Sequence, residues 1–260
     1  MSKYIKRFVV LLVVAILVVL FTQIQDSLPI SESNESTNTA ESELLDESTL
    51  ETQFSMMTDN IKYDLSKIPE FTDKPYVELN KNKPKYSKKE LEAAKISFQN
   101  FSDFDELGRC GTAVASVGTD LMPTEKRGSI GMVKPTGWHT VRYDDLIPDK
   151  YLYNRCHLIG YQLTGQNANE YNLITGTRYL NIDGMLPFEN QIADYVKATN
   201  NHVLYRVTPV FEKDNLVASG VVMEGMSVED NGEGITFCVY AYNEQPGIKI
   251  DHKTGDSQVK

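Results

Sequence analysis

The chain has 260 residues and a formal net charge of −10, which argues against a broad basic surface for polyanions. Any attraction of a polyanion must therefore be local. The chain has only three cysteines and no CxxC pair, which argues against a structural zinc site.

The N-terminus carries a basic flank and then an apolar run. Lys3, Lys6 and Arg7 precede residues 8–21, which contain no polar side chain. This order is typical of a signal peptide or an uncleaved signal-anchor. No small-x-small cleavage site follows the run, so we expect residues 1–25 to be an anchor that leaves the rest of the chain outside the membrane. Cleavage and secretion are the alternative.

An acidic segment follows the apolar run. Residues 31–53 hold seven acidic side chains and no basic one, and most of the rest are Ser, Thr and Asn. Such a segment cannot bury enough apolar surface to offset the entropy of ordering it. We therefore predict a disordered linker over 26–57 and a single folded domain over 58–260, which is long enough for a substantial core.

The folded part alternates between strand and helix patterns. A helix is predicted over 87–99, where Ser87 and Glu90 form an S-x-x-E capping box, and a second begins near Pro187. Residues 172–181 are ambiguous, and 109–118 read as a small-residue strand or a buried turn. The remaining strand patterns cover 74–80, 138–144, 151–156, 202–211, 216–228 and 235–243. The class is therefore α+β, an antiparallel meander with a small number of helices.

The cysteines allow one disulfide and a spare thiol if the domain lies outside the cell. Cys238 lies in the apolar run GITFCVYAYN and is expected to be a small core residue. Cys110 and Cys156 are then the expected pair.

Residues 151–181 gather side chains that suit phosphate chemistry. His157 could act as a general base toward water, and the guanidinium of Arg155 matches phosphate oxygens. The amides of Asn169, Asn172 and Asn181 offer neutral oxygen ligands suited to Mg²⁺. Each residue alone is more often structural, but together they are the parts of metal-assisted phosphodiester hydrolysis.

The same segment resembles a known family. Residues 151–189 are similar to the active-site segment of the DNA/RNA non-specific endonucleases, which are ββα-metal or His-Me finger nucleases. The nearest branch holds the streptococcal DNA-entry nuclease and related secreted DNases. The family's core motif is D-R-G-H, and this chain has N-R-C-H at 154–157. The resemblance extends over PTGWHTVRY, NLITGTRYLN, HVLYRVTPVF and PGIKIDHKTGD.

The resemblance implies a fold and a set of catalytic roles. The fold would be a central antiparallel sheet with flanking helices. His157 would be the general base, and Arg155 would support the active site and the phosphates. Asn181 would hold a single divalent metal ion directly, and Glu189 on the following helix would order metal-bound water.

The chain departs from the family pattern at three positions. Asn154 replaces the Asp of the motif and Cys156 replaces its Gly, while Ala193 stands where the family often has an Arg for the scissile phosphate. Arg178 could compensate for that missing charge. We expect Arg178, Asn154 and Asn172 to contact the substrate.

The implied activity is that of an extracellular endonuclease, membrane-anchored or secreted, without sequence specificity. It would hydrolyse DNA, and RNA as a second substrate class, with Mg²⁺ as cofactor and Mn²⁺ as a substitute. The alternative is a non-catalytic, membrane-anchored DNA receptor or scaffold for DNA uptake, and Asn154 and Ala193 are the features in its favour. A third hypothesis is a phosphodiesterase that acts on small nucleotides.

Overall fold

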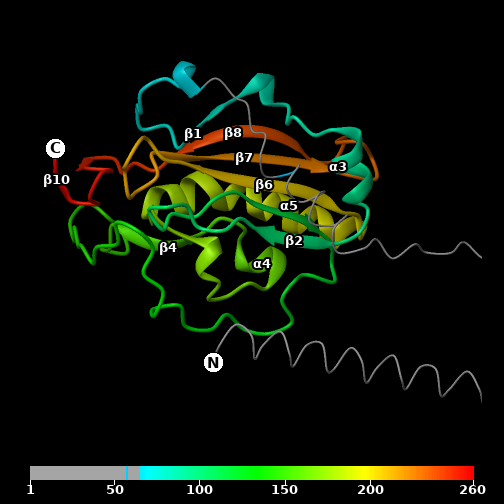
Figure 1. Ribbon diagram of the computed structural model, residues 1–260, viewed down its shortest axis with the longest axis horizontal. Coiled ribbons are helices and arrows are strands. Elements are labelled where there is room, and N and C mark those ends of the chain that lie inside the picture. Colours follow the sequence, from blue (N-terminus) through cyan, green and yellow to red (C-terminus); the bar gives the residue numbers. More distant parts are fainter. Residues whose placement is uncertain (1–56, 58–64) are drawn as a thin grey trace, which may run out of the picture. The chain divides into compact units, whose positions relative to one another are not determined.

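The computed structural model describes Met57 and residues 65–260 (Figure 1). The predicted anchor over 1–25 and, apart from Met57, the predicted linker over 26–57 lie outside the described residues. Among those that are described, no helix has the length and apolar character needed to cross a membrane.

An antiparallel sheet forms the centre of the domain (Figure 1). Its six strands lie in the order β1-β8-β7-β6-β3-β2. They are β1 (Tyr76–Glu78), β2 (Phe98–Phe101), β3 (Ala113–Val117), β6 (Val203–Val210), β7 (Gly220–Ser227) and β8 (Thr236–Tyr242). Strands β6, β7 and β8 form the meander that the sequence predicts, and the α+β class is confirmed.

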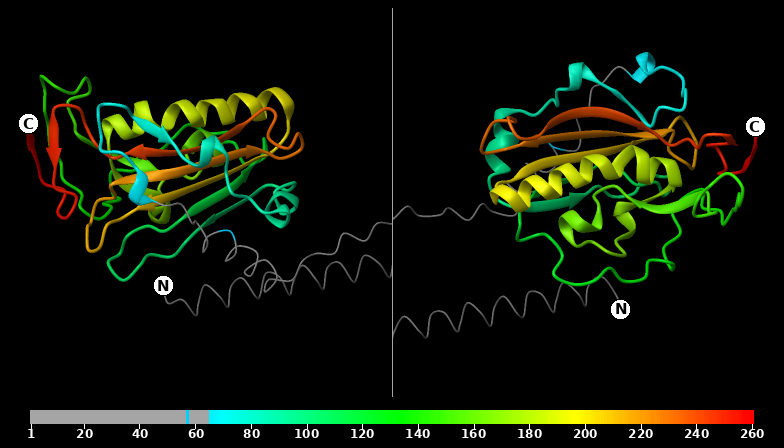
Figure 2. Two further views of the ribbon diagram at one scale, coloured as in Figure 1. Left: turned by 90° about the horizontal axis from the view of Figure 1, so that it is seen from above. Right: turned by 180° about the vertical axis from the view of Figure 1, so that it is seen from behind.

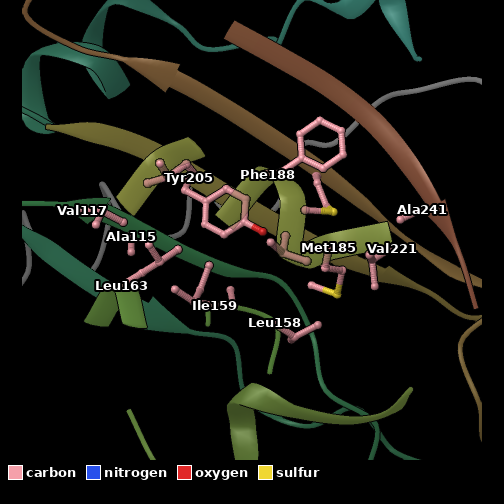
Figure 3. Close-up of a cluster of buried hydrophobic side chains, with 14 of the residues drawn as sticks. Ala115, Val117, Leu158, Ile159, Leu163, Met185, Phe188, Tyr205, Val221 and Ala241 are labelled. Atoms are coloured by element: carbon pink, nitrogen blue, oxygen red, sulfur yellow. The ribbon is translucent and has the colours of Figure 1, made fainter. Parts of the chain in front are cut away.

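Helix α5 (Leu186–Thr199) covers one face of this sheet (Figure 2). Pro187 lies in its first turn, as predicted, and Asn200 ends it in a left-handed conformation. Phe188, Ile192 and Val196 recur every four residues, so they share one face of the helix and are buried against the sheet. Figure 3 shows this core, where Phe188 and Met185 lie near Tyr205 of β6.

The opposite face of the sheet is covered by α3 (Lys88–Ala93). The predicted capping box is present, because the Ser87 hydroxyl accepts from the Glu90 amide and the Glu90 carboxylate accepts from the Ser87 amide. The helix is shorter than the predicted 87–99. Residues 98–101 instead pair with β3, where their aromatic side chains suit a strand.

A buried ion cluster ties α3 to the sheet. Arg206 on β6 donates to Glu90 on α3 and to Glu224 on β7, each at 2.8 Å. The three side chains are at most 11% exposed. Such a cluster is stable only when every charge keeps its partner.

A second, two-stranded sheet pairs β4 (Tyr153–His157) with β5 (Leu173–Thr177). The connection between them contains α4 (Tyr161–Thr164) and the single turn η3 (Glu170–Asn172). A π-helical segment, η4 (Leu180–Met185), then leads directly into α5. The order β4, β5, α5 is the ββα unit that the resemblance implies.

One prediction for the C-terminal half needs correction, and one pair of strands was not predicted. Residues 138–144 form no strand, only an isolated bridge between Arg142 and Tyr151. Their apolar side chains pack with Ile147, Leu152 and Ile248 while the backbone turns, so burial here produces a loop instead of a strand. The C-terminal hairpin of β9 (Ile248–Ile250) and β10 (Ser257–Val259) was not expected.

The predicted disulfide is absent, since all three cysteines are free and buried. The thiol of Cys110 donates to the carbonyls of Glu170 and Leu173, whereas that of Cys156 faces Asn181. Each thiol is therefore satisfied by its own partners. Cys238 is a fully buried residue of β8, as expected.

Candidate active site

A cavity of about 710 Å³ opens where β4 meets η4 and the first turn of α5. Six of the seven predicted site residues line it. They are Asn154, Arg155, His157, Arg178, Asn181 and Glu189. The ββα unit brings them together because η4 lies beside β4, where Asn181 contacts Asn154 and Cys156, and the first turn of α5 lies against Gly160, just after β4.

His157 ends β4, and it is 7% exposed. Its Nε2 lies 2.8 Å from the carbonyl oxygen of Asn167. A carbonyl can only accept, so Nε2 carries the proton and Nδ1 keeps a lone pair. Burial lowers the pKa of His157 and the positive charge of Arg127 adds to this, while the hydrogen bond to Asn167 opposes it. The lowered pKa favours the neutral imidazole, which is the form that can accept a proton.

Glu189 lies in the first turn of α5 and is 8% exposed. Burial raises the pKa of its carboxyl to about 7, against the opposing effects of a hydrogen bond from the Gly160 backbone and the charge of Arg127. A Cβ built on Gly160 would lie 2.6–2.8 Å from the carboxylate atoms. Only glycine at position 160 leaves room for Glu189 in this position.

Asn181 and Asn154 are in direct contact. The Asn181 amide nitrogen donates to Asn154 Oδ1 at 3.1 Å, and Arg178 Nη1 donates to the same oxygen at 3.4 Å. Arg178 also forms a salt bridge with Asp149. Asn154 therefore links the predicted metal ligand to the predicted compensating cation.

Arg155 points toward the loop that precedes β4. Its Nε lies 2.5 Å from the Val133 carbonyl and its Nη2 lies 2.9 Å from the Gly131 carbonyl. The guanidinium also stacks on the Trp138 ring, 4.0 Å from its centroid. These contacts fasten the loop over 131–138 to β4 beside the cavity, and the role of Arg155 toward phosphate stays a prediction.

Asn172 does not belong to the cavity. It is fully buried, and its amide both donates to the carbonyl and accepts from the amide of Ile159. No atom of Asn172 is exposed to a substrate, which contradicts the substrate contact predicted for it. Asn169 likewise has a local role, because it caps η3 by accepting from the Tyr171 amide at 3.1 Å.

Arg127 is the site residue that the sequence analysis missed. It lines the cavity, and its Nη2 lies 3.4 Å from His157 Nδ1. The loop that carries it is fastened by Tyr161, whose hydroxyl donates to the Glu125 carbonyl. Ala193, where the family often has an arginine, is buried in the core instead. The only sequence signal for Arg127 was a Lys-Arg-Gly triplet in a loop far from the motif.

The structure thus defines an α+β domain in which a cavity lined by His157, Asn181 and Glu189 lies along a ββα unit. The family model for the DNA/RNA non-specific endonuclease matches residues 92–229, more than half of the chain. The chain therefore belongs to this family, and it is a nuclease whose substrate is nucleic acid. This result favours the enzyme over the non-catalytic receptor.

Solved structures support the fold. NucA from Streptococcus agalactiae with magnesium bound is 22% identical, with a TM-score of 0.64 over 82% of this chain and 96% of that one. NucA without bound metal is 21% identical, with a TM-score of 0.62 over 86% of this chain and 100% of that one. The Sda1 nuclease with a bound zinc ion is 26% identical, with a TM-score of 0.54 over 64% of this chain and 82% of that one. No match is found among curated proteins.

Proposed function

We propose that this nuclease is a metal-dependent endonuclease without sequence specificity, and that His157 is its general base. One observation carries the proposal. The lone pair of His157 Nδ1 faces Arg127 in a cavity that Asn181 and Glu189 also line. An imidazole that can accept a proton, a guanidinium that can bind phosphate and an amide oxygen that can bind a metal ion therefore line the same cavity.

The residues present fit a divalent cation. Asn181 offers an amide oxygen, a neutral hard ligand, and the nearby Glu189 is a buried carboxylate with no salt bridge to any described residue. No cluster of three His, Cys, Asp or Glu side chains suited to a metal ion occurs among the described residues. We therefore propose Asn181 as the direct protein ligand and Glu189 as a residue that orients water. Mg²⁺ or Mn²⁺ would supply positive charge to stabilise the phosphate in the transition state.

The side chains then divide the remaining work. His157 Nδ1 accepts a proton from the attacking water, and the hydrogen bond from Nε2 to Asn167 keeps the ring oriented. Arg127 binds a phosphate oxygen next to the base. Because its charge lowers the pKa of His157, phosphate binding at Arg127 would neutralise that charge and make the imidazole a stronger base.

The substrate is proposed to be DNA, with RNA as a second class. The polar groups in the cavity suit the sugar–phosphate backbone, which would make cleavage tolerant of sequence. We further propose that the enzyme acts outside the cell, anchored by residues 1–25 or secreted after cleavage. The domain bounds 26–57 and 58–260 also stay predictions.

The test uses the full-length chain in mild detergent. Supercoiled plasmid is incubated with wild type, His157→Ala and His202→Ala, with Mg²⁺ or with EDTA. We expect metal-dependent cleavage by wild type and by His202→Ala, whose histidine does not line the cavity. His157→Ala should lose at least about 100-fold of the rate. Equal rates for His157→Ala and wild type would refute the base assignment, and cleavage of a small nucleotide diester but not plasmid would favour the phosphodiesterase.

A further inference from the structure

The two departures from the family motif converge on one side chain, Asn181. Asn154 Oδ1 accepts from Asn181 Nδ2 at 3.1 Å. On the other side, the Cys156 thiol donates to Asn181 Oδ1 at 3.3 Å. Both ends of the Asn181 amide are therefore held, by the two residues that differ from D-R-G-H.

The contact with Arg178 determines which end of each amide is the oxygen and which is the nitrogen. A guanidinium has donors only, so the Asn154 atom that faces Arg178 must be its carbonyl oxygen. That oxygen needs a donor from Asn181, which places the amide nitrogen of Asn181 toward Asn154. The oxygen of Asn181 must then face Cys156, whose thiol can donate to it.

The fold makes room for a side chain at position 156. Cys156 is fully buried, and it also contacts Met185 Sδ at 3.5 Å. A Cβ built on Gly176 of β5 would lie 2.5 Å from the Cys156 Cβ. Because Gly176 on the neighbouring strand has no side chain, the Cys156 side chain fits beside it. The close packing leaves the thiol only a few possible hydrogen-bond partners.

We propose that Cys156 and Asn154 are positioning residues that fix the Asn181 amide for cation binding. An amide oxygen has two lone pairs, and the thiol occupies one of them. The second lone pair is left for a ligand in the cavity, and the amide cannot turn its nitrogen toward a cation without breaking both hydrogen bonds. This inference rests on the proposed role of Asn181 as the metal ligand.

The test measures Mn²⁺ affinity of the full-length chain by isothermal titration calorimetry, without nucleic acid. Outer partners of metal ligands typically change affinity by about 10–100-fold. We expect Cys156→Ala and Asn154→Ala each to weaken Mn²⁺ binding by at least about tenfold, and Cys156→Ser, which keeps a donor, to restore most of it. Cys110→Ala is the matched control, since that buried thiol donates only to backbone carbonyls.

A double-mutant cycle distinguishes a loss of Mn²⁺ affinity that acts through Asn181 from one caused by a general disturbance of the fold. In an Asn181→Ala background, Cys156→Ala should cause no further loss, because its effect passes through the missing amide. Asn154 is only partly buried, so Asn154→Ala provides the same test if Cys156→Ala fails to fold. Wild-type Mn²⁺ affinity in both single variants would overturn this inference alone. Unchanged affinity in Asn181→Ala would instead overturn the proposed ligand, and this inference with it.

Discussion

The buried carboxylate of Glu189 makes a quantitative prediction about stability and pH. Its pKa is raised from 4.5 to about 7 because burial disfavours the charged form. At 1.36 kcal/mol for each pH unit, ionising it in the folded state costs about 3 kcal/mol. Between pH 4.5 and 7 the folded state binds this proton more tightly than the unfolded state does. This contribution to stability therefore falls as pH rises, and the full cost is present above pH 7.

Glu189→Gln should remove that cost while keeping a hydrogen-bond acceptor for Gly160. We expect the variant to be close to wild type in stability at pH 5 and about 2–3 kcal/mol more stable at pH 8, because most of the cost of ionising Glu189 arises between these two pH values. The same variant should lose nuclease activity. Its gain in stability would then show that the enzyme tolerates an ionised carboxylate at this position for the sake of function.

The assay is urea unfolding of the full-length chain in EDTA, followed by the fluorescence of Trp138, the single tryptophan. Glu92→Gln is the control, because Glu92 is an exposed carboxylate on α3 and its loss should change stability little at either pH. A stability difference for Glu189→Gln that is the same at pH 5 and pH 8 would refute the reasoning. Added Mg²⁺ should stabilise wild type at pH 8 and stabilise the variant less, because Asn181 remains but the carboxylate that orients water is lost.

Three further predictions concern the packing and charges around the site. Gly160→Ala should destabilise the fold by about 1–3 kcal/mol and displace the acid on α5, whereas Gly131→Ala, which meets no close atom, should match wild type in urea unfolding and plasmid cleavage. Arg127→Ala should raise KM for plasmid and move the acidic limb of the pH–rate profile upward, because the loss of a nearby positive charge raises the pKa of His157; an unmoved limb would exclude their coupling. Arg206→Ala should cost about 3–5 kcal/mol in urea unfolding, since it removes the positive charge that the buried carboxylates of Glu90 and Glu224 share, and a loss below 1 kcal/mol would contradict the ion cluster.

Local patterns in the sequence were sufficient for most of the fold. The capping box at Ser87, the proline that opens α5 and the strand-forming residues along β6 to β8 each depend on neighbouring residues, and each prediction is confirmed. The errors arose where distant partners decide the structure. Residues 98–101 became a strand because β3 lies beside them, and 138–144 became a loop because their partners are side chains of other segments.

The residues of the site also divide into those that local sequence could predict and those that distant partners decide. His157, Asn154 and Asn181 could be predicted to lie together because the hairpin and the following helix are contiguous in sequence. The exclusion of Asn172 could not be predicted, since an amide that binds a substrate and one that pairs with Ile159 look alike in a sequence. Arg127 could not be predicted either, because its position depends on how a remote loop folds over β4.

The arginines of the cavity explain how a strongly acidic chain can act on a polyanion. Arg155 donates to the carbonyls of a loop, and Arg178 is paired with Asp149. Arg127 forms no salt bridge with any described residue, so its charge is available to a phosphate. A protein that neutralises about one phosphate shows a shallow dependence of affinity on salt, with a logarithmic slope near −1. Weak attraction of this kind would favour release of the cleaved strands, since few contacts hold them. With His157 as the proposed general base, catalysis would then depend on the alignment of one phosphate with its imidazole.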